Sequence, residues 1–392
     1  MVHKFNSATE AEILDGKTSD VYFERSLRAA SNVDYKGNVV SEFTVSGPLD
    51  TWVNFSGLDE VISILKDKPV NLYAIPEGTI VNPRDSKGIP VPFMRIEGEY
   101  EEFGRLETAM IGFLCQSSGI STYSSRIRLI LKETPFYSFG IRRMHPAISP
   151  MVDRAAFIGG ADGVSGILGA ELIGEQPVGT MPHSLALLMG DDKAWQVTVE
   201  KAGKNGVKTV LIDTFMDEKF AALKVASMFP DLDYIRLDTP SSRRGNFANL
   251  IREVRWELDL RSHQNIKIMV SGGLKLEDLQ NLKEAGAQAF GIGTSMTLHP
   301  FDFSMDIVEI NGTPLTKRGK FSGSKNILRC ERCMKLRTVP ASVVEGSCEC
   351  GGPMVNLLRQ FLRNGKMLDN YDTARQIRER TMRELESFQE ER

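Results

Sequence analysis

Apolar and polar positions alternate along residues 136–295 with the period of short strands joined by helices. The apolar residues at positions 247, 250, 251, 254 and 258, for example, form one stripe of a helix. Strands alternating with crossover helices are typical of a parallel sheet, so we predict an α/β fold. Because only six or seven strands can be found, we expect an irregular or incomplete β/α barrel. The clearest strand candidates are the apolar runs at 137–141, 178–180, 207–213, 234–237, 267–270 and 289–292.

The N-terminal residues follow a different pattern, without regular strand–helix alternation. Residues 58–65 carry apolar side chains at helical spacing, and residues 42–55 predict two strands about a turn at Gly47-Pro48. We therefore predict an N-terminal α+β sheet domain, sandwich-like, before the barrel. Further short strands are expected in it at 71–75, 79–81 and 92–98.

These patterns divide the chain into three predicted domains. The sheet domain spans 1–115, and the barrel with its candidate site spans 116–300. Short alternating pieces at 301–325 could rejoin the N-terminal sheet. Residues 326–392 contain four of the five cysteines and a charged helix, so we predict a small C-terminal zinc-knuckle module there.

Glycine-rich turns follow the last two predicted strands of the barrel. One strand stops at Ser271-Gly272-Gly273, and the next stops at Gly293-Thr294-Ser295. Glycine lets backbone N–H groups approach an anion closely, and the last two strands of a β/α barrel commonly bind phosphate. Ordinary turn chemistry would explain one such turn. Two in tandem indicate a phosphate site.

Charged residues lie at or just after the ends of several other predicted strands. Each one alone is explained by a strand that exits into water, but in a barrel they would meet on one rim, where active sites are built. Arginines bind phosphate and carboxylate oxygens bidentately, and carboxylates could hold ribose hydroxyls directly or through Mg²⁺. This inventory suits a phosphorylated sugar that loses an anion through an oxocarbenium-like state. The residues are Arg142, Arg143, His183, Asp213, Arg236 and Asp238.

The C-terminal cysteines have the paired spacing of a metal site. Cys330-x2-Cys333 and Cys348-x-Cys350 are separated by 14 residues, and two glycines follow the second pair. Four thiolates suit a structural, tetrahedral Zn²⁺ site, although Cys-x-Cys departs from the commonest spacing. Free thiols or a disulfide pair are the alternatives.

Composition excludes several classes of protein. A net charge of −3 and a pI of about 6.1 argue against a general nucleic-acid or membrane-surface binder. No apolar run approaches the ~18 residues of a membrane span, and no secretory signal is visible, so we expect a cytoplasmic protein. No P-loop, HExxH or Ser-His-Asp pattern is found.

Several stretches along nearly the whole chain carry a specific resemblance. The sequence resembles the nicotinate phosphoribosyltransferase family, in its archaeal branch with a cysteine-containing C-terminal module. The stretches are SDVYFER (19–25), SEFTVSGPLD (41–50), YAIPEGT (73–79), FGIRRMHPAISPM (139–151), IGGADGVSGILGA (158–170), VGTMPHSL (178–185), YIRLDTPSSRRGN (234–246), VSGGL (270–274) and FGIGTS (290–295).

The resemblance implies a reaction and its partners. Nicotinate would condense with 5-phosphoribosyl 1-pyrophosphate (PRPP) to nicotinate mononucleotide and pyrophosphate, in NAD biosynthesis. ATP hydrolysis would be coupled to the reaction, and Mg²⁺ would accompany PRPP and ATP. The family forms homodimers with shared active sites, or larger assemblies of dimers. Quinolinate (decarboxylating) and nicotinamide phosphoribosyltransferases are the alternatives within catalysis, and a binding protein built on the zinc module is the alternative outside it.

The resemblance also implies roles for residues around the pyridine base. Tyr22 would stack on the ring from across the dimer interface. Arg142 would contact the nicotinate carboxylate, with help from Arg143. Asp162 and Ser165 would line the base pocket.

The remaining roles concern the phosphoribosyl group and ATP. Arg236 and Asp238 would contact the phosphoribose, and His183 would be phosphorylated by ATP. The alternative for His183 is a histidine that caps a helix. The role of His145 stays open. The 5′-phosphate would be held by Gly272, Gly273, Gly293 and Thr294, and the pyrophosphate could be covered by a basic loop with Lys317, Arg318 and Lys320.

Overall fold

The computed structural model describes the chain except residues 1–2, 33–36, 47–50, 204–205, 369–370 and 391–392, and the side chains of 388–390. It confirms a mixed α/β fold. The chain forms two compact units, one made of Met1–Thr122 with His299–Arg392 and the other of Tyr123–Leu298. The division falls within the helix α5 (Glu107–Leu131).

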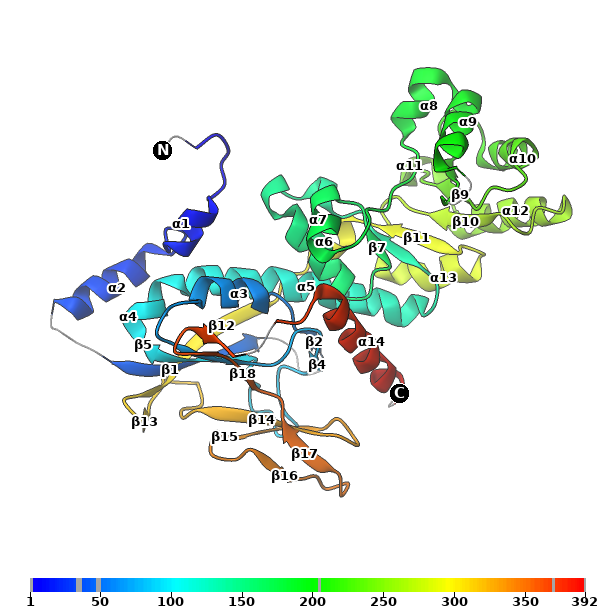
Figure 1. Cartoon of the computed structure of the whole chain (residues 1–392). Helices are drawn as coiled ribbons and strands as arrows, with labels where there is room; N and C mark the ends of the chain where they lie inside the picture. Colours follow the sequence, from blue (N-terminus) through cyan, green and yellow to red (C-terminus); the bar gives the residue numbers. More distant parts are fainter. Residues whose placement is uncertain (1–2, 33–36, 47–50, 204–205, 369–370, 391–392) are drawn as a thin grey trace. The chain divides into compact units, whose positions relative to one another are not determined.

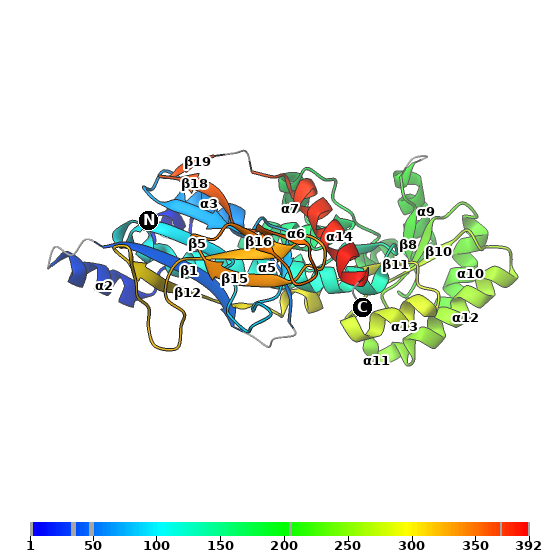
Figure 2. The ribbon, with the colours of Figure 1, turned by 90° about the horizontal axis from the view of Figure 1, so that it is seen from below.

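The first unit is built on an antiparallel sheet that joins both ends of the chain. β1 pairs with β12 on one side and with β5 on the other, and the three strands run side by side in Figures 1 and 2. The segment after the second unit thus returns to the N-terminal sheet. The strand order is β13 (Thr313–Pro314), β12 (Asp302–Ile310), β1 (Asn38–Ser46), β5 (Met94–Glu99), β3 (Asn71–Ala74), β18 (Arg359–Arg363) and β19 (Lys366–Met367).

Aromatic side chains fill the core beneath this sheet. Phe43, Phe55 and Phe93 are fully buried, and Phe303 packs edge-on against Phe93. The helix α3 (Leu58–Leu65) buries its predicted apolar stripe in the same cluster. The other helices of this unit are α1 (Glu10–Leu14), α2 (Val21–Ser31), α4 (Tyr100–Phe103) and the C-terminal α14 (Ala374–Glu390).

The predicted strand pair about Gly47-Pro48 does not form a hairpin. β2 (Val53–Asn54) pairs with β4 (Ile80–Val81), and not with β1. The turn itself lies outside the described residues. A separate sheet carries the cysteines, in the order β15 (Leu336–Pro340), β14 (Lys325–Cys330), β17 (Pro353–Asn356) and β16 (Glu345–Ser347).

The second unit is built on a parallel sheet of six strands that forms a half-barrel. β9, β10 and β11 coincide with the predicted strands, and their mostly apolar, buried residues are typical of a sheet covered on both faces. The strand order is β7 (Gly163–Val164), β6 (Phe136–Ser138), β11 (Ala289–Ile292), β10 (Lys267–Val270), β9 (Tyr234–Leu237) and β8 (Thr209–Leu211).

Helices connect these strands. Figure 1 shows α10, α12 and α13 beside the β9–β11 part of the sheet. Trp195 of α9 is fully buried, and its indole N–H donates to the carbonyl of Leu211 at 2.8 Å. The helices are α6 (Ser149–Ile158), α7 (Ile167–Ile173), α8 (His183–Met189), α9 (Asp191–Ala202), α10 (Glu218–Met228), α11 (Ser241–Arg244), α12 (Phe247–Leu260) and α13 (Leu279–Glu284).

One predicted strand is wrong. Residues 178–180 form no strand, because only the Val178 N–H reaches the neighbouring strand, donating to the Val164 carbonyl at 2.8 Å. The strand β7 (Gly163–Val164) was not predicted, since two residues, one of them a glycine, give no periodic signal. Among the described residues, no helix is long and apolar enough to cross a membrane.

Candidate functional site

The carboxyl ends of the parallel strands surround a cavity of about 360 Å³ in the second unit. Parallel strands all end at one edge of the sheet, so the residues that follow them come together there. The structure brings nine of the predicted site residues into its lining. They are Arg142, Arg143, Ser165, Arg236, Asp238, Gly272, Gly273, Gly293 and Thr294.

The first glycine turn has the backbone geometry that only glycine adopts readily. Gly272 and Gly273 have φ of +88° and +64°. A Cβ on Gly272 would lie 3.1 Å from the carbonyl oxygen and from the carboxylate Oδ1 of Asp238, whereas a Cβ on Gly273 would meet nothing within 4 Å. Arg244 donates to the Gly272 carbonyl at 2.7 Å, so that oxygen already has a partner. The turn is therefore closely packed at Gly272 and has free space beside Gly273.

Arg236 is held in one orientation by three polar partners. Its Nε donates to Ser271 Oγ at 2.9 Å, its Nη1 to Thr180 Oγ1 at 2.5 Å, and its Nη2 lies 3.3 Å from Asp238 Oδ1. The guanidinium also stacks over the Phe139 ring, with 5.3 Å to the ring centroid. A guanidinium has five N–H donors, so some remain for a bound oxygen.

His183 lies next to the cavity, between two carboxylates. Its Nε2 is 3.4 Å from Asp213 Oδ2, and its Nδ1 is 4.0 Å from Asp238 Oδ2. The Asp213 side chain is fully buried, and burial raises the pKa of its carboxyl while His183 lowers it. The His183 ring is 42% exposed, so it can be reached from solvent. This arrangement fixes the imidazole and leaves it accessible.

Arg142 and Arg143 lie in a short 3₁₀ turn, Ile141–Arg143, two residues after the end of β6. Both are exposed, and neither has an ion-pair partner in the described part of the chain. Ser165 follows β7, and its backbone N–H donates to the Ser138 carbonyl at 3.1 Å. One side of the cavity thus offers two uncommitted guanidinium groups beside a serine.

Other predicted residues are not part of the lining of this cavity. Asp162 precedes β7, at the amino end of the strands, where it ion-pairs with Arg128 and accepts the Phe136 N–H at 2.9 Å. Tyr22 lies on α2 in the other compact unit and is 56% exposed. In the basic loop of that unit, Lys317 and Lys320 pair with the buried carboxylate of Asp306.

Sequence reasoning did not single out two residues that shape the cavity. Ser271 accepts from Arg236 and donates to Asp238 Oδ1 at 2.6 Å, so it links the two. Thr180 holds the other side of the same guanidinium. Ser271 directly follows β10, and this position at a strand end could have identified it as a site residue.

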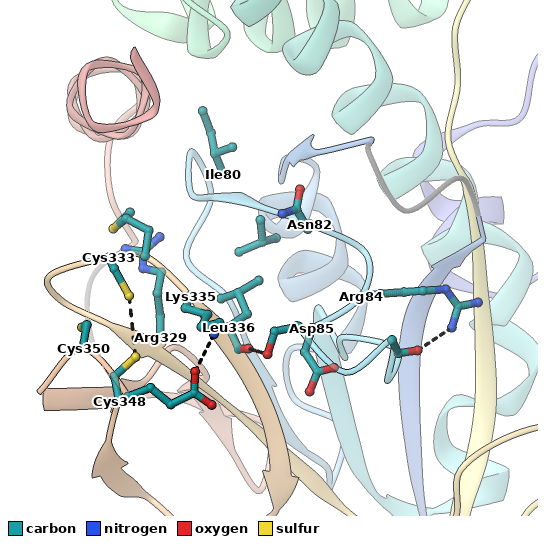
Figure 3. Close-up of a pocket in the computed structure, with 15 residues that line it drawn as sticks. Ile80, Asn82, Arg84, Asp85, Arg329, Cys333, Lys335, Leu336, Cys348 and Cys350 are labelled. Atoms are coloured by element: carbon teal, nitrogen blue, oxygen red, sulfur yellow. Dashed lines mark hydrogen bonds and ion pairs between the residues drawn. The ribbon is translucent and has the colours of Figure 1, made fainter. Parts of the chain in front are cut away.

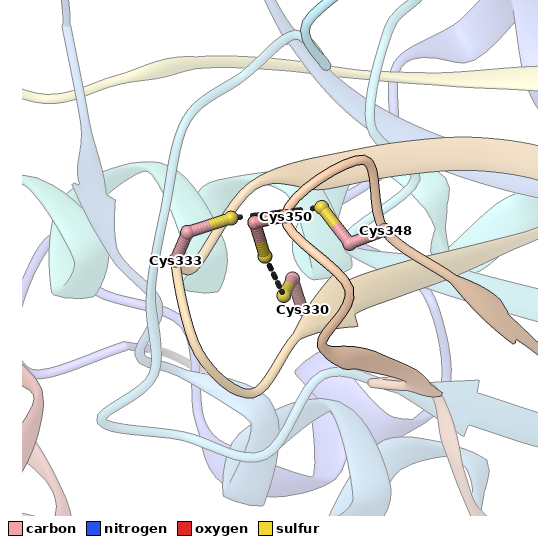
Figure 4. A group of neighbouring side chains, drawn as sticks. All are labelled: Cys330, Cys333, Cys348 and Cys350. Atoms are coloured by element: carbon pink, nitrogen blue, oxygen red, sulfur yellow. Dashed lines mark hydrogen bonds between the residues drawn. The ribbon is translucent and has the colours of Figure 1, made fainter.

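The four cysteines of the C-terminal module converge on one point (Figure 4). The Sγ atoms of Cys330 and Cys350 are 3.5 Å apart, those of Cys333 and Cys348 are 3.6 Å apart, and all four lie within 4.8 Å of one another. Sulfurs bound to one zinc ion at about 2.3 Å would lie roughly 3.8 Å apart. The group therefore fits a tetrahedral metal ion.

The cluster borders a larger hollow of the same unit. Its volume is about 770 Å³, and Figure 3 shows Arg84 and Asp85 on one side with Cys333 and Cys348 on the other. Asp85 accepts the Thr338 backbone N–H at 2.9 Å. The cysteine module is thus hydrogen-bonded to the N-terminal part of the chain.

Two family models match most of the chain. The model for the N-terminal domain of quinolinate phosphoribosyl transferase matches residues 20–118, and the model for its C-terminal domain matches residues 120–306. A nicotinate phosphoribosyltransferase of Mycobacterium tuberculosis (strain ATCC 25618 / H37Rv) is 26% identical over 62% of this chain and 56% of its own. One of Bacillus subtilis is 28% identical over 57% and 45%. The chain spans about half the length of these curated relatives.

Solved structures extend the similarity to the full chain. The crystal structure of nicotinate-nucleotide pyrophosphorylase from Pyrococcus furiosus is 44% identical, with a TM-score of 0.94 over 99% of both chains. Human nicotinic acid phosphoribosyltransferase has a TM-score of 0.71 over 94% of both chains at 16% identity, which shows a shared fold.

Proposed function

Because the chain belongs to the family of nicotinate and quinolinate phosphoribosyltransferases, we propose that it joins nicotinate to PRPP, with release of pyrophosphate. The observation that carries this proposal is the single cavity that unites the two glycine turns, the Arg236–Asp238 pair and the free arginines. Those groups match the three parts of the product, which are a phosphate, a ribose and a carboxylate-bearing ring.

Each part of the substrate has a proposed place. The 5′-phosphate would accept backbone N–H groups of Gly273 and Gly293 and the hydroxyl of Thr294. Asp238 would bind the ribose hydroxyls and stabilise the positive charge that develops as pyrophosphate leaves. Arg142 would hold the nicotinate carboxylate bidentately, and Arg143 would add charge nearby.

The proposal includes coupling to ATP through His183. An imidazole nitrogen is a good phosphoryl acceptor when the ring is neutral. The γ-phosphoryl group would move from ATP to that nitrogen, and ADP would leave. Asp213 would hold the ring by its 3.4 Å contact, as the orienting group of a nucleophile does. Mg²⁺ would enter with PRPP and ATP, and Asp238, which lines the cavity, offers carboxylate oxygens of the kind that it prefers.

We propose that the cysteine cluster binds a structural Zn²⁺ ion. All four positions around the metal would be filled by Cys330, Cys333, Cys348 and Cys350, which leaves none for a substrate.

The active assembly would be a homodimer in which Tyr22 reaches the partner's cavity. Its 56% exposure on α2 is consistent with a ring available to another molecule.

Quinolinate is the competing substrate, because both family models carry its name and two free arginines could bind two carboxylates. One experiment separates the candidates. The protein is incubated with PRPP, Mg²⁺ and nicotinate, nicotinamide or quinolinate, with and without ATP, and the nucleotides are resolved by HPLC. Nicotinate mononucleotide from nicotinate alone supports the proposal. The same product from quinolinate, or nicotinamide mononucleotide from nicotinamide, contradicts it.

A further inference from the structure

Asp153 is a fully buried carboxylate that has no part in the proposed chemistry. It lies on α6 and accepts hydrogen bonds from two different segments. Ser138 Oγ donates to its Oδ1 at 3.2 Å, and the Gly166 backbone N–H donates to its Oδ2 at 3.0 Å. One side chain therefore joins α6 to the end of β6 and to the segment after β7.

Both segments continue directly into the cavity. Ser138 is the last residue of β6, and the chain then runs through Phe139 to Arg142. Gly166 follows Ser165, which lines the cavity. The Ser165 N–H donates to the Ser138 carbonyl, so the two segments are also tied to each other. A shift of Asp153 would move Ser165 and the arginine turn together.

Glycines let the backbone pack very closely against Asp153. A Cβ on Gly166 would lie 2.2 Å from Asp153 Oδ2, and a Cβ on Gly169 would lie 2.6 Å from the same atom. This close packing accounts for the Gly-x-x-Gly spacing within the stretch at 163–170. The carboxylate thus packs closely against the first turn of α7.

Asp153 is also buried without a counter-charge. In the described part of the chain it has no ion-pair partner, and burial raises the pKa of its carboxyl to about 6 against the effect of its two hydrogen bonds. Burying a charge without a cation is costly. A carboxylate that is buried at such a cost in stability is expected where it holds neighbouring segments in a defined geometry.

We propose that Asp153 is a positioning residue for recognition of the pyridine carboxylate, acting through Ser165 and the Arg142 turn. This inference rests on the proposed function. In the sheet, β11 separates β6 and β7 from β10 and β9, which carry the glycine turn and Arg236. Loss of the Asp153 tie should therefore disturb the base side of the cavity more than the phosphoribosyl side, which touches the end of β6 through the stacking of Arg236 on Phe139.

The test compares Asp153→Asn with Ser138→Ala and measures KM separately for nicotinate and PRPP. The asparagine can keep one acceptor, but its NH₂ group cannot accept the Gly166 N–H. We expect KM for nicotinate to rise about tenfold in Asp153→Asn and less in Ser138→Ala, because one or two hydrogen bonds are lost. KM for PRPP should stay within about twofold.

The matched control is Asp85→Asn in the other compact unit. Asp85 is also buried and accepts the backbone N–H groups of Lys87, Ile89 and Thr338. This variant should lose stability while both KM values stay unchanged. If Asp153→Asn raises both KM values equally, or leaves both unchanged, the positioning role is wrong.

Hydrogen exchange gives a readout that does not need turnover. In Asp153→Asn, amides at 141–144 and 165–167 should exchange faster than in the wild-type protein, while amides at 271–274 should not change. Uniformly faster exchange, or none, would overturn the inference. Absence of turnover in the wild-type protein would instead contradict the proposed function, so the two failures are distinguishable.

Discussion

Arg236 shows at the residue scale how this site is preorganised. Three contacts with Ser271, Thr180 and Asp238 fix the guanidinium before any substrate arrives. Positioning a charged group in advance would lower the cost of reorganisation during the proposed reaction. The same contacts neutralise part of its charge through Asp238, so Arg142 and Arg143 remain the uncommitted cations of the cavity.

His183→Ala tests the proposed coupling to ATP. The variant should lose stimulation by ATP and keep some ATP-independent synthesis, because the alanine has no nitrogen to accept a phosphoryl group. Initial rates with and without ATP provide the measurement. His3→Ala, which removes an exposed histidine of the other unit, should behave as the wild-type protein. ATP stimulation that survives in His183→Ala would rule out this role.

Gly273→Ala tests the glycine turn as a phosphate site. There is room for the methyl group, but φ of +64° strains alanine by about 1–2 kcal/mol and displaces the N–H groups of the turn. We expect KM for PRPP to rise about tenfold, with kcat changed much less. Steady-state kinetics with varied PRPP measures this. Normal PRPP affinity with lost turnover would contradict the assignment to the non-reacting phosphate.

Single residues could be predicted from sequence where strand ends mark them. A position at or just after the end of a parallel strand indicated Arg236, Asp238 and the glycine turns, and the structure gathers them in one cavity. The same reasoning could not place Asp162, whose carboxylate turns toward Arg128 at the opposite end of β7. β7 has only two residues and gives no periodic signal, so the sequence did not show that a strand begins directly after Asp162.

Glu107 makes the first turn of α5 sensitive to pH. Burial, and then the charge of Asp306, raise the pKa of the Glu107 carboxyl to about 7, while Lys317 lowers it. A carboxyl with a raised pKa binds a proton more tightly in the folded state. The free energy of unfolding should therefore decrease as pH rises from about 4.5 to about 7.

Glu107→Gln should remove this dependence, because glutamine stays neutral. Relative to the wild-type protein, the variant should gain stability between pH 5 and pH 8, as measured by urea unfolding at both values. Glu101→Gln, at an exposed position of α4, is the control and should follow the wild-type protein. An equal pH dependence in wild type and Glu107→Gln would disprove the explanation.

Elements with regular patterns were predictable, and short ones were not. The apolar stripe of 58–65 matches α3, and the buried runs at 234–237, 267–270 and 289–292 match β9, β10 and β11. The false strand at 178–180 and the missed β7 are both too short for periodicity to decide. The structure of such segments depends on contacts with distant residues, such as the bond from the Val178 N–H to the Val164 carbonyl.

At the scale of the whole molecule, the cysteine module anchors the C-terminal helix. Arg329, next to Cys330, binds Glu384 of α14 through two bonds of 2.7 and 2.8 Å. The Glu384 side chain is buried and that of Arg329 is 18% exposed, so the pair is largely shielded from water. Thr381 of the same helix donates to the Gly78 carbonyl at 3.3 Å. A metal ion that fixes Cys330 would also fix the arginine beside it.

Arg329→Ala and zinc removal should therefore have the same effect on α14. Breaking a largely buried ion pair costs roughly 3 kcal/mol of stability. The amides of α14 should therefore exchange faster, and its peptide bonds should become sensitive to protease. Lys335→Ala is the control, because Lys335 lies in the same module but pairs with the exposed Glu349. Unchanged protection of α14 after chelation would contradict this coupling.

Sequence could not establish how distant segments pair. The return of residues 301–325 to the N-terminal sheet was an open possibility, and the pairing of β18 with β3 had no signal. Local patterns report which face of a strand is buried, but they do not identify its neighbour.

The mixed origin of the antiparallel sheet has a consequence for synthesis of the chain. β1, β5 and β3 leave the ribosome early, but β12 and β18, which cover their two sides, come from the last quarter of the sequence. At about 5–20 residues per second, roughly 10 to 40 s separate Glu99 from Asp302, where the first of these two strands begins. During that interval both edges of the early sheet are unpaired and open to aggregation. The intervening parallel unit is continuous in sequence, so it can be complete before the domain that begins the chain.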